Sequence, residues 1–528
     1  MSDYNQQQPQ QPPQRQEQQQ FSKGQQNSVT GAASSISESV AETPDKYDAE
    51  IADNADKAHR HNNDLLRTVT QYTEYSVTTG EAMNDELRRV RSKKECHEIP
   101  EKEPTNVYNL FSKQFLGLKF FKPYITTILI LLVFMFCVFS IYWGSFFQRN
   151  KRLVNLKVLV ALEPSNADND LLSQALREAT EVSPVNKLAG WHINTDGLSE
   201  SEIIRKVHHQ KYWGAIYVSQ QDASSQLASA FSNGSSFNTS SLVKAYYESG
   251  RDPNGMKSYV EPAINRFSGV YSSILRQKVF PSLISGLSSS ELSTARSNGM
   301  LTSYPTIDIV DGRPMKDPVL MAPLQVGLIY LILISFFQIL WNTNLNGYVA
   351  KTLNPMSFIG YRMIIAQVTF LILSLVVTTL NRAFQVDFNN TWKGGFGVGW
   401  MIHYLTLSAV GGANENIMLI VLPIVPLGGF WLMFFIILNV SATFSPIETC
   451  PKLFRFAYAM PIKNAYELMK ILFFDTYRGH IGRYFGILVA WVVLNNILMP
   501  FCLMFFSFKM KRAAAKMAKA KVAEEHKA

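Results

Sequence analysis

Residues 124–147 read YITTILILLVFMFCVFSIYWGSFF, an apolar run without a charged side chain. A helix needs about 20 apolar residues to cross the hydrocarbon core of a bilayer, and this run is long enough. It begins too late in the chain to be a cleaved secretory signal. We therefore predict a first membrane helix over residues 119–147, which separates a polar tail from a large polar region.

The tail that precedes this helix, residues 1–118, is predicted to be disordered and cytoplasmic. It starts with a Gln/Pro-rich run and continues rich in Ser, Thr, Ala and Glu. Such a composition buries too little apolar surface to offset the entropy of ordering. Its basic patch RRVRSKKE, residues 88–95, is interpreted as a solvated cluster that helps to set orientation, with attraction to an anionic leaflet as the alternative.

The polar region that follows, residues 148–318, is long enough for a folded domain. Helical patterns alternate with strand candidates, and Ser199 and Glu202 form a capping-box signature before one helix. The strand candidates are LKVLVAL at 156–162, GWHIN at 190–194 and WGAIYVS at 213–219. This alternation predicts an α/β domain with at least partly parallel strands.

Composition and motifs exclude several function classes. The net charge of +9 is spread out, without the basic and aromatic interleaving of a nucleic-acid surface, so we expect no nucleic-acid partner. The four cysteines are divided among the tail, two predicted spans and one outer loop, so no intrachain disulfide framework is expected. His192, His208 and His209 lack metal-ligand partners at suitable spacing. Phosphate-loop, nucleophile-elbow and H-E-x-x-H motifs are absent from the sequence, so we expect neither an enzyme nor a cofactor.

From residue 319 the chain becomes strongly apolar again. We predict five further membrane helices in a domain that covers residues 319–508, at 319–341, 358–380, 395–412, 417–440 and 484–508. With the first helix these make six spans in a one-plus-five order. The predicted fold class is thus an α-helical polytopic membrane protein with a large α/β extracytoplasmic domain after its first span.

Charge and glycosylation signals give the predicted sidedness. The basic segment 509–528 directly follows a span, which favours the cytosol for this end, and six spans place both ends on one side. Three N-glycosylation triplets, at Asn233, Asn238 and Asn389, then fall on the outer side. We therefore expect both termini in the cytoplasm and a glycoprotein at the outer surface.

The predicted spans carry few ionisable side chains, which counts against a proton- or ion-coupled transporter. Arg362 is expected to snorkel at the cytosolic end of its span, and His403 is the titratable group expected near a span centre. Other polar side chains either line a polar path or, as we favour, hydrogen-bond between helices. The candidate polar residues of the bundle are Gln325, Gln338, Gln367, His403, Asn495 and Asn496.

The predicted outer loop between the last two spans, residues 446–482, contains an amphipathic helix after Pro461. Apolar residues recur at helical spacing, while charged residues occupy the other side. This helix is interpreted as a gate or lipid-facing surface, or alternatively as a lid that packs on the bundle. Its candidate residues are Lys463, Tyr466, Glu467, Leu468, Lys470, Leu472 and Phe473.

Three stretches carry a family resemblance: DGRPMKDPVLMAPLQVGLIYLILISFF, GFGVGWMIHYL and NVSATFSPIETCPKLFRFAYAMPIKNAYELMKILFFDTYRGHIGRYFGILVAW. Together they resemble the fungal nitrosoguanidine-resistance membrane proteins, over roughly residues 110 to 508 and most specifically from 311 to 495. The layout is also similar to the permease halves of type-2 ABC exporters and to phage-infection-protein-like membrane proteins. The resemblance implies a multi-pass plasma-membrane protein with a role in tolerance to toxic hydrophobic or alkylating compounds.

Two functions fit these observations. The first is a transporter-permease type protein that exports or redistributes amphipathic drugs or phospholipids, since few intramembrane charges suit apolar cargo. The alternative is a non-transporting regulator or scaffold that affects lipid asymmetry or other transporters through partners, and a receptor-like outer domain on a membrane base is a further rival. The expected partners are membrane lipids, a hydrophobic drug or phospholipid cargo, and either a second copy of the chain or other membrane proteins.

Overall fold

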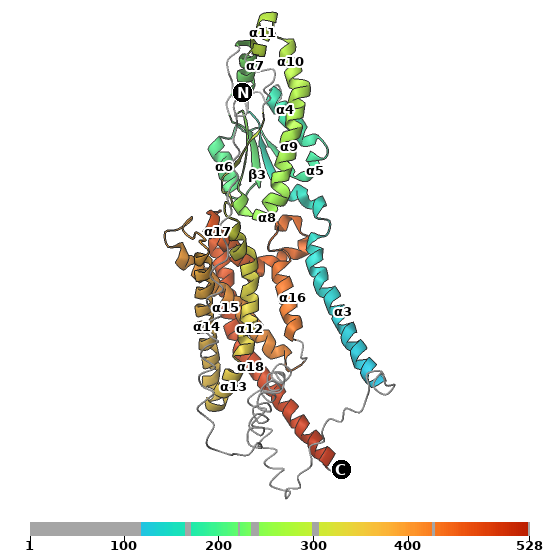
Figure 1. Ribbon diagram of the computed structural model, residues 1–528, viewed down its shortest axis with the longest axis vertical. Helices are drawn as coiled ribbons and strands as arrows, with labels where there is room; N and C mark the ends of the chain where they lie inside the picture. The colour runs from blue at the N-terminus through green and yellow to red at the C-terminus, as the bar shows by residue number, and fades with distance from the viewer. Residues whose placement is uncertain are drawn as a thin grey trace, which may run out of the picture. The chain divides into compact units, whose positions relative to one another are not determined.

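The computed structural model describes residues 118–163, 170–219, 222–233, 242–297, 306–424 and 428–525 (Figure 1). The predicted disordered tail, residues 1–118, lies outside these residues apart from Leu118. The described chain runs from one apolar helix through an α/β domain into a helical bundle.

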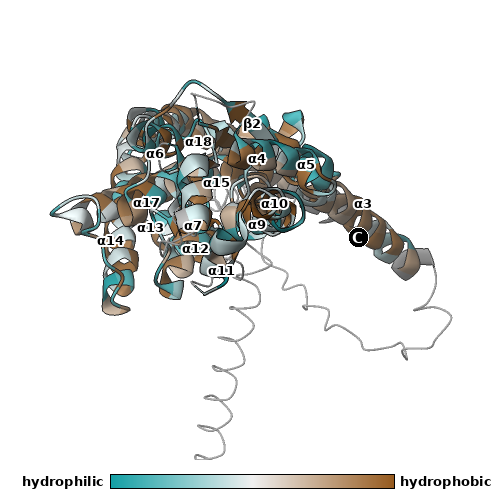
Figure 2. Cartoon of the chain, turned by 90° about the horizontal axis from the view of Figure 1, so that it is seen from above, coloured by the Kyte–Doolittle hydropathy of each residue, from teal (hydrophilic) through white to brown (hydrophobic). Residues whose placement is uncertain are grey.

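The first helix, α3, spans Leu118–Phe146 and coincides with the predicted helix at 119–147. Only 6% of its most apolar stretch is buried, and the hydropathy colouring of Figure 2 marks most of this helix as hydrophobic. The ring of Phe134 lies 4.3 Å from that of Phe430, which belongs to α16, Gly428–Val440. Because an apolar surface of this size is unfavourable in water, α3 suits a lipid environment.

The α/β domain is built on a five-stranded sheet in the order β2-β1-β3-β4-β5. Its strands are β1 Lys157–Ala161, β2 Gly190–Asn194, β3 Gly214–Val218, β4 Val243–Tyr247 and β5 Asp308–Asp311. β1 pairs in parallel with both β2 and β3, β5 pairs in parallel with β4, and β4 runs antiparallel to β3. The three predicted strands and the partly parallel pairing are confirmed, whereas β4 and β5 were not predicted.

Alternate strand residues pack against opposite helix layers, as the pleat requires. Val160 and Ile216 join a core with α4, Leu171–Glu181, and α9, Glu261–Ile274. Leu159 and Tyr217 instead pack with the buried side of α6, Glu200–His208. Figure 1 shows α6 and α9 on opposite sides of the sheet, so the domain has three layers.

The remaining elements of the domain are short. The predicted capping box is confirmed at the start of α6, where the Ser199 hydroxyl accepts from the Glu202 amide and the Glu202 carboxylate accepts from the Ser199 amide. The other helices are α5 Val185–Leu188, α7 Ala223–Asn233, α8 Pro253–Gly255, α10 Phe280–Ser285 and α11 Ser289–Ser297. Irregular helical turns are η2 Arg149–Asn155, η4 Ser249–Arg251, η5 Met256–Val260 and η6 Leu275–Val279.

The bundle begins after β5. Its elements are η7 Pro318–Leu320, η8 Ala322–Val326, α12 Gly327–Trp341, α13 Thr343–Thr352, α14 Pro355–Ala383, α15 Gly395–Val421, α16, η9 Ile447–Thr449, η10 Lys452–Ala459, α17 Pro461–Phe474 and α18 Ile481–Glu525. Four stretches among the described residues are long and apolar enough to cross a membrane: Phe121–Phe146, Pro318–Trp341, Pro355–Ala383 and Ile481–Lys516. This arrangement is consistent with a polytopic membrane protein.

The boundary between the predicted spans 395–412 and 417–440 is wrong. Residues 417–421 complete α15, which runs unbroken from Gly395 to Val421, and α16 is a separate helix of 13 residues. The polar stretch Asn414-Glu415-Asn416 lowers the hydropathy there, which indicated a loop. All three side chains are buried, because neighbouring helices supply partners for them, and the helix therefore continues through this stretch.

The interpretation of the loop helix as a lipid-facing surface also needs correction. In α17 every residue except Glu467 is buried, so the helix packs inside the molecule, against α15, α18 and η4 among other elements. Its predicted apolar side joins the bundle core through Leu468, Leu472 and Phe473, with Tyr466. Its charged side is buried too, and Lys463 and Lys470 do not face solvent. The alternative, a helix that packs on the bundle, describes this geometry.

Candidate functional site in the helical bundle

An ion pair lies inside the bundle, between α14 and α15. The guanidinium of Arg362 donates from Nη2 to Oε1 of Glu415, and the two residues are only 9% and 6% exposed. Arg362 therefore does not snorkel from the end of its span, as was expected from the sequence, but is buried with a partner. Glu415 was missed because the predicted span boundary placed it in a loop. An arginine in an apolar helix was itself the available signal, since such a charge normally has a buried partner.

Amide side chains lie near Glu415, the acidic member of this pair. Gln367 accepts through Oε1 from Tyr404, at 3.0 Å, and from Ser408, at 2.7 Å. Asn416 donates from Nδ2 to the backbone oxygen of Asn495 at 2.9 Å, and the Asn495 amide donates to Ala409 O at 2.8 Å. These bonds join α14, α15 and α18. Hydrogen bonding between helices, the role favoured from the sequence, is what Gln367 and Asn495 perform.

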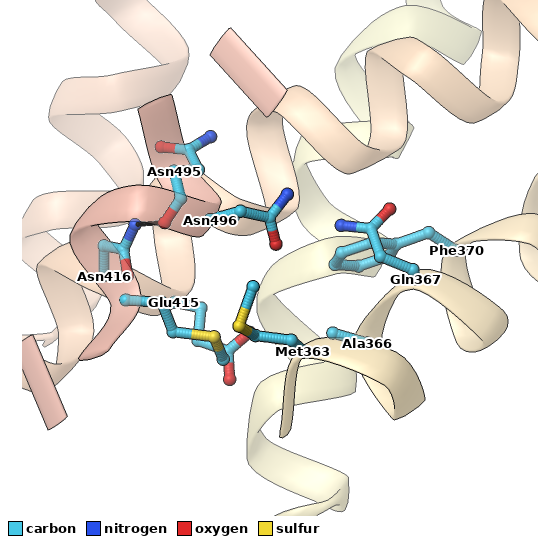
Figure 3. Close-up of a pocket in the computed structure, with 10 residues that line it drawn as sticks. Met363, Ala366, Gln367, Phe370, Glu415, Asn416, Asn495 and Asn496 are labelled. Atoms are coloured by element: carbon cyan, nitrogen blue, oxygen red, sulfur yellow. Dashed lines mark hydrogen bonds between the residues drawn. The ribbon is translucent and has the colours of Figure 1, made fainter. Parts of the chain in front are cut away.

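The cluster borders a small cavity, drawn in Figure 3. Glu415, Gln367, Asn495 and Asn496 line it together with Met363, Ala366, Phe370, Gly412, Asn416 and Met499. Its volume of about 10 Å³ is at the limit for a single water molecule. Its lining residues belong to α14, α15 and α18. The structure therefore brings three predicted polar residues, Gln367, Asn495 and Asn496, to the side of the unpredicted Glu415.

Two glycines allow the helices to approach this closely. A Cβ at Gly411 would lie 2.4 Å from the Phe370 ring on α14, and one at Gly412 would lie 2.8 Å from Cβ of Asn495 on α18. Any larger side chain at either position would force α15 away from its neighbours. The polar bonds of the cluster thus depend on small residues in the middle of α15.

The other predicted polar residues lie elsewhere. His403 is buried, and its Nδ1 lies 2.9 Å from the Thr378 hydroxyl. Gln325 donates to the sulfur of Met321, and Gln338 Oε1 is buried without a hydrogen-bond partner among the described residues. A further unpredicted bond network centres on Asn414, which donates to the Ser335 hydroxyl at 2.9 Å and accepts from Trp431 Nε1 at 3.0 Å. These pairings cross-link α12, α14, α15 and α16.

The glycosylation candidates are placed differently from one another. Asn389 is exposed in the connection between α14 and α15, and Asn233 ends α7. Asn238 lies outside the described residues.

Of the histidines weighed as metal ligands, His208 lies 3.1 Å from Glu248 through Nδ1. Across the part of the chain that the structure describes, no group of three or more His, Cys, Asp or Glu side chains is placed to hold a metal.

The described residues contain four candidate spans, three of them in a helical bundle with an internal ion pair and one before the α/β domain, and this arrangement defines the class of the chain as a polytopic membrane protein. The chain belongs to the family described as "Protein of unknown function (DUF3533)", whose model matches residues 127–497, from α3 into α18. It is 31% identical over 421 residues to the uncharacterized endoplasmic reticulum membrane protein YJR015W of Saccharomyces cerevisiae, a match that covers 75% of this chain and 82% of the yeast protein. No solved structure matches the chain.

Proposed function

We propose that the protein redistributes amphipathic molecules, phospholipids or hydrophobic drugs, between membrane leaflets without catalysing a covalent reaction. The observation that carries this proposal is the polar cluster around Arg362 and Glu415, inside a bundle with a largely apolar core. Polar groups at membrane depth offer a lipid headgroup or a polar drug group partners that hydrocarbon does not. Asn496 lines the cavity, and among the described residues its amide donates to Val492 O of its own helix, which leaves the amide oxygen available to a passing group.

The cavity has room for about one water molecule in this structure, so a headgroup needs α14 and α18 to separate before it can pass. Both helices present apolar side chains on their exposed faces, among them Ile364, Ile372 and Ile497. The two helices therefore already face lipid on their outer sides. When they separate, there is no hydrophobic penalty, because lipid tails replace the apolar contacts that are lost between them.

The experiment that tests the proposal uses the purified chain in proteoliposomes. Movement of a fluorescent phospholipid and of a hydrophobic cation between leaflets is followed against protein-free vesicles. We expect movement with the wild-type protein and a several-fold slower rate for Asn496→Leu. Gln325→Leu is the matched control, because it removes a similar amide from the bundle at a position away from the cavity.

Equal rates for the two variants would contradict a path at this cavity. No movement above protein-free vesicles, from protein with a cooperative thermal transition, would contradict transport by the chain alone. That second result would favour a regulator or scaffold that acts through partners. This second candidate function rests on the fact that Gln367 and Asn495 already have partners, as side chains with a purely structural role would.

The proposed topology has six spans, with α15 and α16 as further crossings, both termini in the cytoplasm and the α/β domain on the opposite side. The name of the yeast relative favours the endoplasmic reticulum membrane over the plasma membrane expected from the sequence. The topology is tested by glycosidase treatment of wild-type protein and an Asn389→Gln variant, with localisation of a tagged chain by microscopy. A mobility shift lost in Asn389→Gln supports the proposed side, and stronger labelling of Asn389→Cys than of wild type by a maleimide applied from the cytosol contradicts it.

The proposed physiological role is tolerance to toxic amphipathic or alkylating compounds, as the likeness to the nitrosoguanidine-resistance proteins suggests. The proposed partners are membrane lipids, the cargo itself, and a second copy of the chain or another membrane protein. Growth of cells that lack or overproduce the protein, in the presence of such compounds, tests this role. Unchanged tolerance in both strains would contradict it.

A further inference from the structure

A second and larger cavity lies at the end of the bundle where the α/β domain packs against it. Its volume is about 260 Å³, and charged side chains from η4, α17, the segment before η10 and the start of α18 line it. Its lining includes the charged side chains of Arg251, Asp252, Glu448, Lys463, Glu467, Lys470 and Arg483. A cavity of this size holds several water molecules or one small anion.

Two buried lysines of α17 share a single carboxylate in the wall of this cavity. Lys463 Nζ lies 3.2 Å from Glu467 Oε1, and Lys470 Nζ lies 2.9 Å from Glu467 Oε2. Lys463 also donates to the backbone oxygen of Thr443 at 3.1 Å, and Lys470 donates to that of Arg251 at 2.7 Å. An ammonium group has three N–H donors. Among the described residues, two donors of each lysine have a partner, which leaves one donor of each lysine for a ligand.

The third buried cation, Arg251, has no carboxylate within ion-pair distance in the described part of the chain. Its guanidinium donates to the backbone oxygens of Tyr212 and Gln210, at 2.6 and 3.2 Å, and lies 3.8 Å over the Trp213 ring. The neighbouring Asp252 uses one carboxylate oxygen to cap α8 through the Gly255 amide at 2.9 Å. The arginine is therefore held in place by neutral groups, and its charge is compensated only from a distance.

The buried charges of the wall do not balance. Arg251, Lys463 and Lys470 are positive and Asp252 is negative, and all four are buried, while the negative Glu467 is partly exposed, so these five groups leave one positive charge in excess. At the exposed rim, Glu448 is an anion and Arg483 a cation, so the rim adds no net charge to this sum. An uncompensated buried charge is costly, and an anion that accepts hydrogen bonds from several donors would remove the cost.

We propose that this cavity binds a phosphate group, carried either by a phospholipid headgroup or by a small soluble phosphate. The excess charge and the unused ammonium donors match the charge and the several acceptor oxygens of phosphate. Tyr484 and Arg483 at the start of α18 also line the cavity, and a candidate span begins at Ile481. The cavity thus lies at the end of an apolar helix, which is the level of lipid headgroups in a bilayer.

Anion binding here does not depend on lipid movement through the bundle, so the two are tested separately. Fluorescently labelled full-length protein in uncharged detergent is titrated with inorganic phosphate and with dihexanoyl phosphatidate, at constant ionic strength set by chloride. Dihexanoyl glycerol is the uncharged control. Saturable binding of the phosphatidate alone identifies a headgroup site, whereas binding of inorganic phosphate identifies a soluble ligand. Saturation by neither phosphate compound overturns the proposal.

Substitutions in the cavity wall test whether phosphate binds at this cavity. Lys470→Met is expected to weaken phosphate binding about tenfold or more, because it removes a charge-assisted donor and the excess charge together. Lys452→Met is the matched control, an exposed lysine of η10 that does not line the cavity. Unchanged affinity in Lys470→Met, or an equal loss in Lys452→Met, overturns the assignment.

Two rim variants keep the test valid even if Lys470→Met does not fold. Glu448→Gln removes an exposed negative charge and should tighten phosphate binding about threefold, while Arg483→Gln should weaken it about threefold. Opposite effects from two exposed positions cannot arise from a general loss of folded protein. Effects of the same sign, or no effect in either variant, overturn the proposal.

Discussion

Two buried charge clusters of this protein differ in their balance. Inside the bundle, Arg362 faces Glu415, one cation against one anion, beside a cavity of about 10 Å³. Where the α/β domain meets the bundle, Lys463 and Lys470 share Glu467 with Arg251 nearby, beside a cavity of about 260 Å³. The first cluster has no net charge and little free space, whereas the second has an excess positive charge, unused ammonium donors and a larger cavity. Charge balance therefore separates an ion pair that joins helices from one that is suited to a ligand.

The carboxylate of the unbalanced cluster should be the most sensitive position. Glu467→Gln leaves two buried ammonium groups without a counter-charge, and we expect a loss of about 4 kcal/mol in the free energy of unfolding. Thermal unfolding of the detergent-solubilised protein measures the change. Glu448→Gln, at the exposed rim of the same cavity, is the control and should change stability little. Equal effects in both variants would show that Glu467 does not hold the cluster together.

The balanced pair should respond differently to single and double replacement. Glu415→Leu leaves Arg362 buried and unpaired, and we expect a loss of about 3 kcal/mol. Replacement of both residues by leucine removes the charges together, and the double variant should regain most of that loss. A double-mutant cycle on unfolding free energies measures the coupling. If the double variant lost as much stability as the two single variants together, Arg362 and Glu415 would not be coupled as an ion pair.

The pH dependence of stability sharpens the same comparison. Burial alone would raise the pKa of Glu467, but the adjacent Lys470 and Lys463 outweigh it and lower the pKa from 4.5 to about 2. A carboxyl whose folded pKa is depressed stabilises the fold above its unfolded pKa, and this contribution is lost as pH falls toward the folded value.

The stability difference between wild type and Glu467→Gln should therefore stay constant from pH 7 to 5. It should shrink by about 2 kcal/mol at pH 3. Unfolding midpoints at pH 7, 5 and 3 measure it, with Glu448→Gln as the reference. A difference that is the same at pH 3 and pH 7 would contradict an ionised Glu467.

The two clusters also differ in the free space beside them, and a glycine substitution tests how tightly the smaller cavity is packed. Gly412→Ala places a methyl group 2.8 Å from Cβ of Asn495, in the wall of the small cavity, and should lower the free energy of unfolding by about 2 kcal/mol. Gly397→Ala on the same helix meets no atom within 4 Å and is the control, expected to be neutral or slightly stabilising. Thermal unfolding of both variants gives the comparison. A neutral Gly412→Ala would show that α15 and α18 are loosely packed.

Local patterns predicted much of the fold. The helix α3, the strands β1 to β3 and the capping box of α6 were all readable from the sequence, because each depends on residues that are neighbours along the chain. The strands β4 and β5 were not, since β5 reads Asp308-Ile-Val-Asp311 and acquires its strand character only by pairing with β4. Of the candidate site, Gln367, Asn495 and Asn496 were named in advance, while Glu415 was not.

The sequence by itself determined which stretches avoid water, because hydropathy is a property of each residue and sums along the chain. The tertiary structure decided which charges are paired. Glu415 is compatible with the interior because Arg362 lies on a helix beside it, and α17 is buried because other helices and η4 cover its charged side. Both outcomes depend on groups that are far apart in sequence, and the energy of a buried charge is set by the neighbours that folding brings to it.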